Sequence, residues 1–313
     1  MRRRLGLLEE PSIEQGGKEA LSKLDAARID TSPLHGLWAL TNRDLKKWYK
    51  VPFIFLMSLI QPFIWLALFG KAMNLTAIFI GGSFNIPGLN IPKEVLNQIG
   101  KQIMLQTFGT QDYFSYLAIG MLSFISIFTA MFSGMSIVWD RRLGFLDKVL
   151  STPVARGAIP MAKVLSTVVR ALAQAAIVLL LAILLGMDAS HITLTGLLGS
   201  FAALLLLIIG FASLFVTLAI RSTSWEAQMA IMNLLNLPIL FASNAMFPVT
   251  YMPEWLQTVA KINPVSYAAD ICRQLLLASP GMADIGFGFT YLAAFAATLS
   301  ILGIILSWRY LSK

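Results

Sequence analysis

The residue types that most often carry out catalysis are sparse in this chain. Its 313 residues include two histidines, His35 and His191, and one cysteine, Cys272. The Gly-Gly-Lys sequence at 16–18 lacks the spacing of a phosphate-binding loop, and the sequence has neither an H-E-x-x-H zinc motif nor a G-x-S-x-G nucleophile motif. One cysteine allows neither an intramolecular disulfide nor a cysteine-based metal site. We therefore expect no catalytic residue, no metal and no cofactor in this chain, and no ATP hydrolysis by a P-loop of its own.

A charged stretch at residues 140–156 is the first candidate for a functional surface. Its apolar residues Leu143, Leu146 and Val149 recur at helical spacing, and the Ser-Thr-Pro sequence at 151–153 breaks that helix. A short amphipathic helix of this kind, held between two membrane spans, can dock in a groove of a soluble partner. The alternative is an ordinary basic loop. The stretch carries Asp140, Arg141, Arg142, Gly144, Phe145, Pro153 and Arg156.

The second candidate, at residues 248–267, is too interrupted to span a membrane and too apolar for a free loop. Segments of this kind form half-buried re-entrant helices where they pack against protein. The alternative is an amphipathic helix that lies on the outer surface. The residues that mark this candidate are Pro253, Trp255, Asn263, Pro264 and Tyr267.

Asparagines mark the third candidate, inside a long apolar stretch at 227–247. Asn233, Asn236 and Asn244 fall roughly on one face of a helix there. Amide groups in lipid need hydrogen-bonding partners, so this face should meet protein or water. Ordinary helix packing is one explanation, and a transport pathway or a dimer seam is the other.

Composition places these candidates in an integral membrane protein. Hydrophobic residues make up 57% of the chain and charged residues 13%, against about 25% charged residues in a soluble domain. We therefore predict an all-α fold with six transmembrane helices, which carry almost no ionisable residue away from their ends. Arg170 is placed at the start of the third, and ion-driven transport is disfavoured. The spans are predicted at about 51–70, 113–139, 165–187, 194–220, 227–247 and 287–308.

The remaining segments differ in character. Residues 1–33 are polar and mixed in charge, which predicts a flexible cytoplasmic N-terminus ahead of a transmembrane domain at 34–313. Residues 34–50 alternate apolar and basic residues, which suits an interfacial helix on the membrane surface or a polar lead-in to the first span. The long loop at 71–112 contains a possible short amphipathic helix at 93–106.

Charge asymmetry gives the orientation. With the N-terminus in the cytoplasm, 19 Lys and Arg lie inside and 5 lie outside, so both termini are predicted to be cytoplasmic. This places the chain in the cell membrane, in contact with lipid. The net charge is +8, and the basic residues flank apolar runs. This pattern fits the predicted topology better than nucleic-acid binding. No apolar stretch follows the basic first residues before Pro33, so no cleaved signal peptide is expected.

Taken in order, these segments resemble the permease subunits of type-2 ABC transporters over roughly residues 34–312, and most closely the daunorubicin-resistance exporter permeases. The most specific part is residues 132–145, FSGMSIVWDRRLGF, where a span end rich in small residues leads to an acid–basic pair, a glycine and an aromatic. Thr152-Pro153 and Arg156 match its continuation. The second part runs from Phe247-Pro248 through Pro253-Glu254-Trp255-Leu256 to Asn263-Pro264, with Tyr267 and Arg273.

The resemblance implies roles for these segments. Residues 140–156 would be the coupling helix that contacts a nucleotide-binding subunit, and residues 251–277 would be re-entrant outer helices. Two permease copies, forming a homodimer, would pair with two ATPase subunits that hold the ATP and Mg. The complex would export amphipathic drugs, lipids or lipid-linked glycans, with the asparagine face near the seam and the pathway. The loop at 71–112 is longer than the family pattern.

Two other classes of function stay open from the residues alone. A membrane enzyme that modifies lipid would need a polar cluster at the bilayer surface. The nearest acidic pair, Asp140 and Asp147, would lie about 10 Å apart on a helix, too far for joint metal binding. A passive channel or a scaffold is the other alternative.

Overall fold

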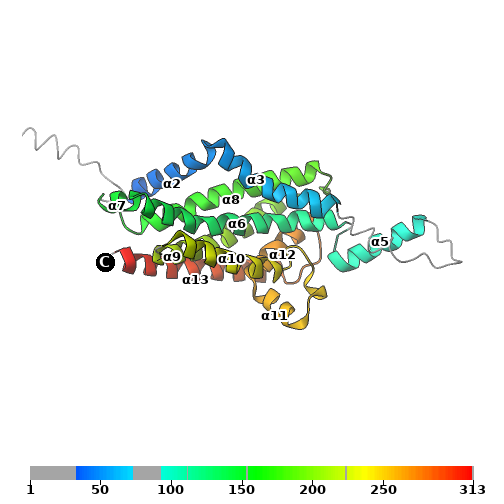
Figure 1. The fold of residues 1–313 in the computed structure, drawn as a ribbon. Coiled ribbons are helices and arrows are strands. Elements are labelled where there is room, and N and C mark those ends of the chain that lie inside the picture. The colour runs from blue at the N-terminus through cyan, green and yellow to red at the C-terminus, as the bar shows by residue number, and fades with distance from the viewer. Residues whose placement is uncertain (1–32, 73–92, 111, 153, 223, 312–313) are drawn as a thin grey trace, which may run out of the picture.

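The computed structural model describes residues 33–72, 93–110, 112–152, 154–222 and 224–311, and these ranges contain helices and no strand. Most helices run along one axis in an elongated bundle (Figure 1). The all-α prediction is thus confirmed for the described residues. In chain order the elements are α2 (Pro33–Tyr49), α3 (Pro52–Trp65), the π-helical η1 (Leu66–Ala72), α5 (Lys93–Phe108), α6 (Tyr113–Arg142), α7 (Phe145–Leu150), α8 (Ala158–Leu184), α9 (Leu194–Arg221), α10 (Trp225–Phe241), the 3₁₀ turn η2 (Val249–Tyr251), α11 (Glu254–Ile262), α12 (Pro264–Leu277) and α13 (Ile285–Leu311).

Four helices of the described chain are long and apolar enough to cross a membrane. They are α8, α9, α13 and the helical stretch Gln98–Arg142 that contains α6. The predicted spans at 51–70 and 227–247 fall on shorter helices: an apolar stretch Phe55–Leu68 and the 17-residue α10. Since 17 residues rise about 26 Å, α10 is slightly shorter than a hydrocarbon core of about 30 Å. The structure supports a multi-pass membrane protein, and the count of six crossings stays a prediction.

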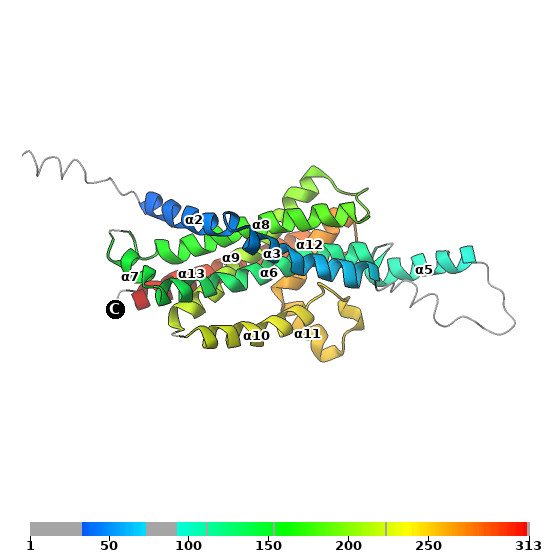
Figure 2. The same cartoon turned by 45° about the horizontal axis from the view of Figure 1, so that its top comes forward.

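The centre of the bundle is formed by α6 and α9. Almost every side chain of α6 is buried, and α6 packs against α8, α9, α10 and α12. α9 packs in turn against α8, α12 and α13. In Figure 2, α10 and α11 lie along one side of this centre, while α2 and α8 lie along the other.

Short polar side chains fix where several helices begin. Asp112 accepts a hydrogen bond from the backbone N–H of Ser115 at the start of α6. Thr193 does the same at the start of α9, and Ser224 at the start of α10. These caps satisfy N–H groups that the first turn of a helix leaves without a partner.

α10 is shorter than the span predicted for it. The Asn263 side-chain amide donates to the carbonyl oxygens of Ile239 and Ala242, each at 2.7 Å. These carbonyls belong to the last turn and the cap of α10, where no further helical N–H is available to them. The chain after Phe241 therefore turns away from the helix axis.

α8 begins earlier than the predicted third span, so Arg170 lies well inside the helix. Its first residue is Ala158, so Arg170 lies 12 residues into the helix, about 18 Å from its start. The guanidinium donates to the carbonyl of Ser166 at 3.3 Å and to the hydroxyl of Thr167 at 3.1 Å. The arginine is thus accommodated by its own helix.

The predicted coupling helix is divided in two. α6 continues through Arg142, and Gly144 then adopts a φ of +67°, which glycine tolerates and which ends the helical path. α7 follows as a six-residue helix, Phe145–Leu150. Asp140 therefore belongs to the last turn of the long helix.

The helices predicted before the last span are present as α11 and α12. α11 stands apart from the bundle axis, whereas α12 packs against α6, α9 and α13 (Figure 1). The short helix predicted in the loop at 93–106 is confirmed as α5. The predicted flexible N-terminus and loop residues 73–92 lie outside the described residues.

Candidate functional site

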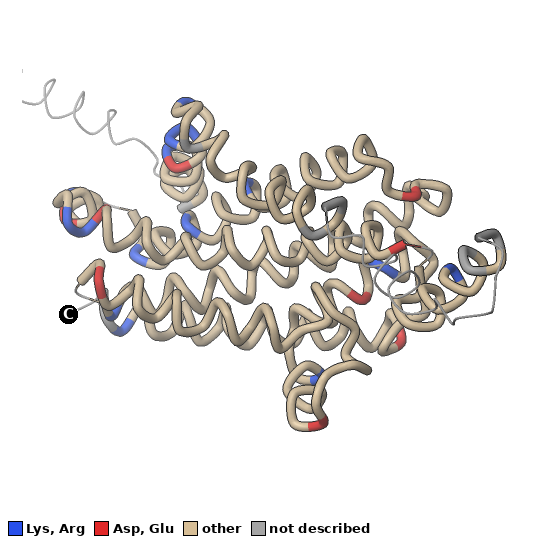
Figure 3. The backbone as a smooth tube through the Cα atoms, turned by 45° about the vertical axis from the view of Figure 1, so that its right-hand side comes forward, with Lys and Arg blue, Asp and Glu red and all other residues tan. Residues whose placement is uncertain are grey.

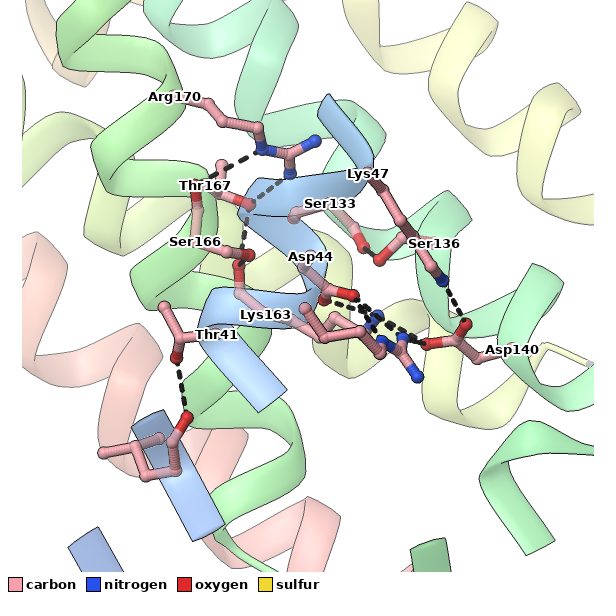
Figure 4. Close-up of polar contacts among 12 residues, drawn as sticks. Thr41, Asp44, Lys47, Ser133, Ser136, Asp140, Lys163, Ser166, Thr167 and Arg170 are labelled. Carbon is pink, nitrogen blue, oxygen red and sulfur yellow. Dashed lines mark hydrogen bonds and ion pairs between the residues drawn. The ribbon is translucent and has the colours of Figure 1, made fainter. Parts of the chain in front are cut away.

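Five charged side chains from three helices meet where α2 lies against the ends of α6 and α8. α2 supplies Arg43, Asp44 and Lys47, α6 supplies Asp140, and α8 supplies Lys163 (Figure 4). We call these five residues the ion-pair cluster. Because α2 has 3.6 residues per turn, positions 43, 44 and 47 share one face, and this face is turned toward the other two helices.

Each carboxylate of the ion-pair cluster has more than one cation. Asp140 lies 2.5 Å from both Arg43 and Lys163 and 3.3 Å from Lys47. Asp44 lies 2.7 Å from Lys163 and 2.8 Å from Arg43. Lys163 and Arg43 thus each bridge the two carboxylates, and the three helices are connected through shared partners.

Burial makes this arrangement demanding. The side chains of Asp44, Asp140 and Lys163 are 9%, 7% and 6% exposed, so none of them is solvated by bulk water. Removal of one partner from a buried pair leaves an uncompensated charge, which typically costs 3–5 kcal/mol. The cluster therefore keeps α2, α6 and α8 together.

The α7 helix is attached to the same cluster. The Arg43 guanidinium lies over the Phe145 ring, 3.6 Å from its centroid, in a cation–π contact. Leu146 and Val149 of α7 are buried against Ile159 at the start of α8, with Leu40 of α2 packed beside them. Movement of α7 would thus be passed directly to α2 and α8.

Arg141 connects α6 to the end of α9. Its guanidinium donates to the carbonyl oxygens of Ser222 and Ile220, at 2.6 and 2.7 Å. These carbonyls lie at the C-terminal end of α9, where a cation is also favoured by the helix dipole. Arg141 is thereby committed to an intramolecular contact.

The predicted coupling residues therefore fall into two groups. Asp140, Arg141 and Phe145 are engaged inside the protein, and Gly144 shapes the turn before α7. Arg142 and Arg156 are exposed, together with Leu143, Asp147 and Lys148. Pro153 lies outside the described residues. We call the exposed residues between α6 and α8 the α7 surface, made of Arg142, Leu143, Asp147, Lys148, Ser151, Thr152, Ala155 and Arg156.

At the other end of the bundle, Asn263 and Pro264 form the corner between α11 and α12. Asn263 is buried, caps α12 through the N–H of Val265, and also closes α10. Pro264 occupies the first position of α12, where a missing N–H carries no penalty.

The other predicted outer residues lie around this corner. Pro253 precedes α11, and Trp255 on α11 is 71% exposed. The Tyr267 hydroxyl donates to the carbonyl of Lys261 at 2.8 Å, and its ring lies 4.3 Å from that of Tyr291. The structure therefore brings Asn263, Pro264 and Tyr267 together and leaves Trp255 on the surface.

The three asparagines predicted on one helical face are not together. Asn233 is exposed and Asn236 half-buried on α10, whereas Asn244 lies beyond the end of that helix and is buried. In the described chain, the side-chain oxygens of Asn236 and Asn244 are buried and have no hydrogen-bond partner. The shared face is therefore corrected to Asn233 and Asn236.

A buried arginine organises the surroundings of Asn244. Arg273, on α12, donates to the carbonyl oxygens of Tyr116, Asn244 and Ala245 at 2.7–3.2 Å. Its guanidinium carbon also lies 3.5 Å from the centre of the Tyr116 ring. We call this arrangement the arginine clamp.

The arginine clamp depends on a glycine in α6. A Cβ on Gly120 would lie 1.7 Å from the carbonyl oxygen of Ala245 and 2.7 Å from the Arg273 guanidinium. Because the backbones approach so closely, only a residue without a side chain fits at Gly120.

The sequence patterns did not predict a site role for Arg43, Asp44, Lys163 or Arg273. The available signal was an acidic residue, Asp44, within a basic amphipathic segment, and a lysine seven residues before Arg170 in an otherwise apolar helix. Among the described residues, no three His, Cys, Asp or Glu side chains gather as a metal site would require. The arrangement is suited to mechanical connection between helices.

Comparisons with known proteins show which family the sequence matches. The family model described as "ABC-2 type transporter" matches residues 35–277, well over half of the chain. The ycf38 transport permease of Cyanophora paradoxa is 28% identical over 240 residues, which cover 76% of this chain and 73% of that protein. Its counterpart in Pyropia yezoensis is 29% identical over 238 residues, covering 76% and 72%.

A bacterial relative has a more specific name. The daunorubicin resistance ABC transporter permease protein DrrB1 of Streptomyces coeruleorubidus is 28% identical over 181 residues, or 57% of this chain and 62% of that protein. The family match covers α2 with the ion-pair cluster, the α7 surface and the whole of α12 with the arginine clamp. The chain therefore belongs to the ABC-2 type transporter family.

Proposed function

We propose that this chain is the transmembrane permease subunit of an ATP-driven exporter, whose ATP and Mg are held by a separate ATPase subunit. The observation that carries the proposal is that the α7 surface is exposed, while α7 itself packs on α8 and contacts the ion-pair cluster through Arg43. An exposed connection between two long helices suits a contact that receives force from a soluble partner. Family membership supports the same assignment.

Charge distribution supports an orientation with the α7 surface in the cytoplasm. Figure 3 shows Lys and Arg gathered at the end of the bundle that carries α2, α7 and the end of α13. α2 also begins at the end of the bundle where α13 finishes (Figure 1). Cytoplasmic segments of membrane proteins are enriched in Lys and Arg. In this proposal, both termini and the α7 surface therefore lie on the cytoplasmic side of the cell membrane.

The mechanism follows from how the α7 surface is attached. Closure of the ATPase subunits around ATP displaces α7, and the Arg43–Phe145 contact and the ion-pair cluster transmit that displacement to α2, α6 and α8. The shared partners of Asp140 and Lys163 allow the helices to move relative to one another while each charge keeps a counter-charge. Access of the pathway then shifts from the inside to the outside.

The pathway belongs, in this proposal, between two copies of the chain. The outer face of α10 exposes Asn233, Leu234 and Leu237, and in the described chain α10 packs mainly on α6. A homodimer seam at this face would line a route with amides and apolar side chains, which suits an amphipathic drug, a lipid or a lipid-linked glycan. The corner at Asn263 and Pro264 would close this route on the outer side, as re-entrant helices do.

Purification of the tagged chain from membranes of its native host tests the assignment. We expect an ATPase subunit to co-purify and the reconstituted complex to hydrolyse ATP. Arg142→Glu combined with Arg156→Glu should lower both retention of that subunit and ATP-dependent transport several-fold, because the α7 surface reverses charge. Lys101→Glu is the matched control, since it reverses an exposed charge on α5.

The same preparation separates the alternatives. A chain that never retains an ATPase overturns the proposal. Ion currents in a bilayer without ATP would favour a passive channel, and chemical turnover of lipid by the isolated chain would favour a lipid-modifying enzyme. Insertion of both variants into membranes, checked by fractionation, keeps a folding defect from being read as a coupling defect.

A further inference from the structure

A groove runs along the bundle between α8 and α13. α8 and α13 both pack along α9 but contact each other little, so α9 forms the floor of the space between them. The groove has a volume of about 280 Å³. Apolar side chains from these three helices make up most of its walls, among them Met161, Leu165, Val168, Leu205, Ile209 and Ile304.

Small residues keep the groove open. Gly303 of α13 lines it, and a Cβ there would lie 2.8 Å from the Thr217 hydroxyl. Ser300 and Ser213 meet across the floor, with their hydroxyl oxygens 3.1 Å apart. A larger pair of side chains at these positions would fill the space that the helices leave.

The shape of the groove fits a single hydrocarbon chain. Its lining on α9 extends from Leu205 to Thr217, which is about 18 Å along a helix axis. One leaflet of a bilayer is about 15 Å thick, half of the roughly 30 Å hydrocarbon core. The two lengths match, so one extended acyl chain can lie along the groove within one leaflet.

Charge at one end of the groove indicates the headgroup. Arg221 follows Thr217 by four residues and so lies on the same face of α9, one turn closer to the basic end of the bundle. Arg221 is exposed, and an exposed arginine at a membrane surface attracts anionic lipid headgroups.

From the shape, the apolar lining and the charge together, we infer that this groove binds one acyl chain of an anionic phospholipid from the leaflet at the basic end of the bundle. The chain lies between α8 and α13 on the α9 floor, and its headgroup lies near Arg221. Leu37 of α2 also lines the groove. Because Leu37 lies seven residues before Asp44, the bound lipid also contacts α2 two turns away from its ion pairs.

Photolabelling tests this inference on the full chain reconstituted in vesicles. The probe is phosphatidylglycerol that carries a diazirine midway along one acyl chain, and the adducts are located by peptide mass spectrometry. We expect adducts to concentrate on residues 161–168 and 300–304. Leu165→Trp should lower labelling of these segments at least fivefold, because the indole fills the groove. Leu180→Trp is the matched control, since Leu180 is an exposed leucine of the same helix outside the groove.

Ile209→Phe provides a second way to fill the groove from its floor, should Leu165→Trp fail to insert. Labelling that spreads evenly along the exposed face of α13, or that survives both groove-filling variants, overturns the inference. Equal labelling by the phosphatidylcholine version of the probe overturns it as well, because the headgroup must then be irrelevant. The readout needs neither ATP nor a partner subunit, so its outcome is separate from that of the proposed function.

Discussion

At the basic end of the bundle, Lys163 and Arg43 bridge two carboxylates, whereas at the other end Arg273 is held by backbone carbonyls and an aromatic ring. Both solutions bury a cation, but they restrain the chain differently. Charge–charge attraction falls off gradually with distance and depends weakly on direction, so side chains can exchange partners as helices shift. Hydrogen bonds to carbonyl oxygens are short and directional, so the clamp fixes one backbone arrangement.

We infer from this difference that the helices at the ion-pair cluster can shift, whereas the backbone at the arginine clamp stays fixed. The ion-pair cluster joins three separate helices through long side chains and connects to the exposed α7 surface. The clamp joins α12 to α6 and to the turn after α10, where Gly120 allows backbone contact. In the proposed function, a permease that receives force at one end needs a fixed joint at the other. Four predictions test this contrast, from the largest expected effect to the smallest.

Loss of the clamp should be the most damaging change. Arg273→Ala leaves the carbonyls of Tyr116, Asn244 and Ala245 buried without that donor, so we expect about 3–5 kcal/mol of lost stability. The free energy of unfolding in SDS titration of the protein in mixed micelles measures this loss. Arg273→Lys keeps the charge but not the planar fork, and should recover less than half. Full recovery by lysine would show that charge, and not direction, holds this end.

Loss of one carboxylate at the ion-pair cluster should cost less. Asp140→Asn leaves Arg43 and Lys163 with Asp44, so we expect about 2–3 kcal/mol in the same titration. Lys163→Met in that background should cost clearly less than it does alone, with a coupling energy of about 1–3 kcal/mol. Additive losses would mean that the two residues do not act as a pair.

The turn before α7 should show a smaller, local effect. Gly144 has a positive φ and open space around it, so Gly144→Ala costs only the left-handed backbone penalty of about 1 kcal/mol. Faster hydrogen exchange at the amides of Phe145–Leu150 should report it. Gly157→Ala is the control, because Gly157 has equal space but a helical φ of −67°. Equal effects at both glycines would exclude the backbone explanation.

The exposed member of the cluster should matter least. The Lys47 side chain is 58% exposed and lies 3.3 Å from Asp140, so Lys47→Ala should cost about 0.5 kcal/mol or less. Raising the salt concentration to 1 M should abolish this difference, because solvent ions screen an exposed pair. A loss that persists in high salt would place Lys47 among the buried charges.

Local patterns in the sequence were sufficient for most of the helices. Apolar runs of spanning length predicted α6, α9 and α13 to within a few residues, and the interrupted apolar segment after 248 predicted the short helices α11 and α12. The end of α10 was not predictable in this way. It depends on Asn263, whose amide reaches the last carbonyls of α10 from more than twenty residues away.

The candidate site was found in part. The segment around Asp140 was identified from its charge and its family likeness, but those signals are silent on which side chains face inward. A carboxylate next to basic residues in the sequence is expected to be exposed, unless another helix covers it in the fold. Here α2 and α8 cover Asp140, and the exposed positions are instead Arg142 and its neighbours on the α7 surface.

The sequence was sufficient to predict a helical membrane protein with one basic side and a resemblance to ABC-2 permeases. Hydropathy, charge asymmetry and local motifs are properties of short segments, so they can be read without the fold. The tertiary structure alone decided which charges are paired. Asp44 pairs with Lys163, which is over a hundred positions away in the sequence. Arg273 donates to the carbonyl of Asn244, beyond α10 and nearly thirty positions away. Such contacts depend on how whole helices pack, and no local pattern encodes them.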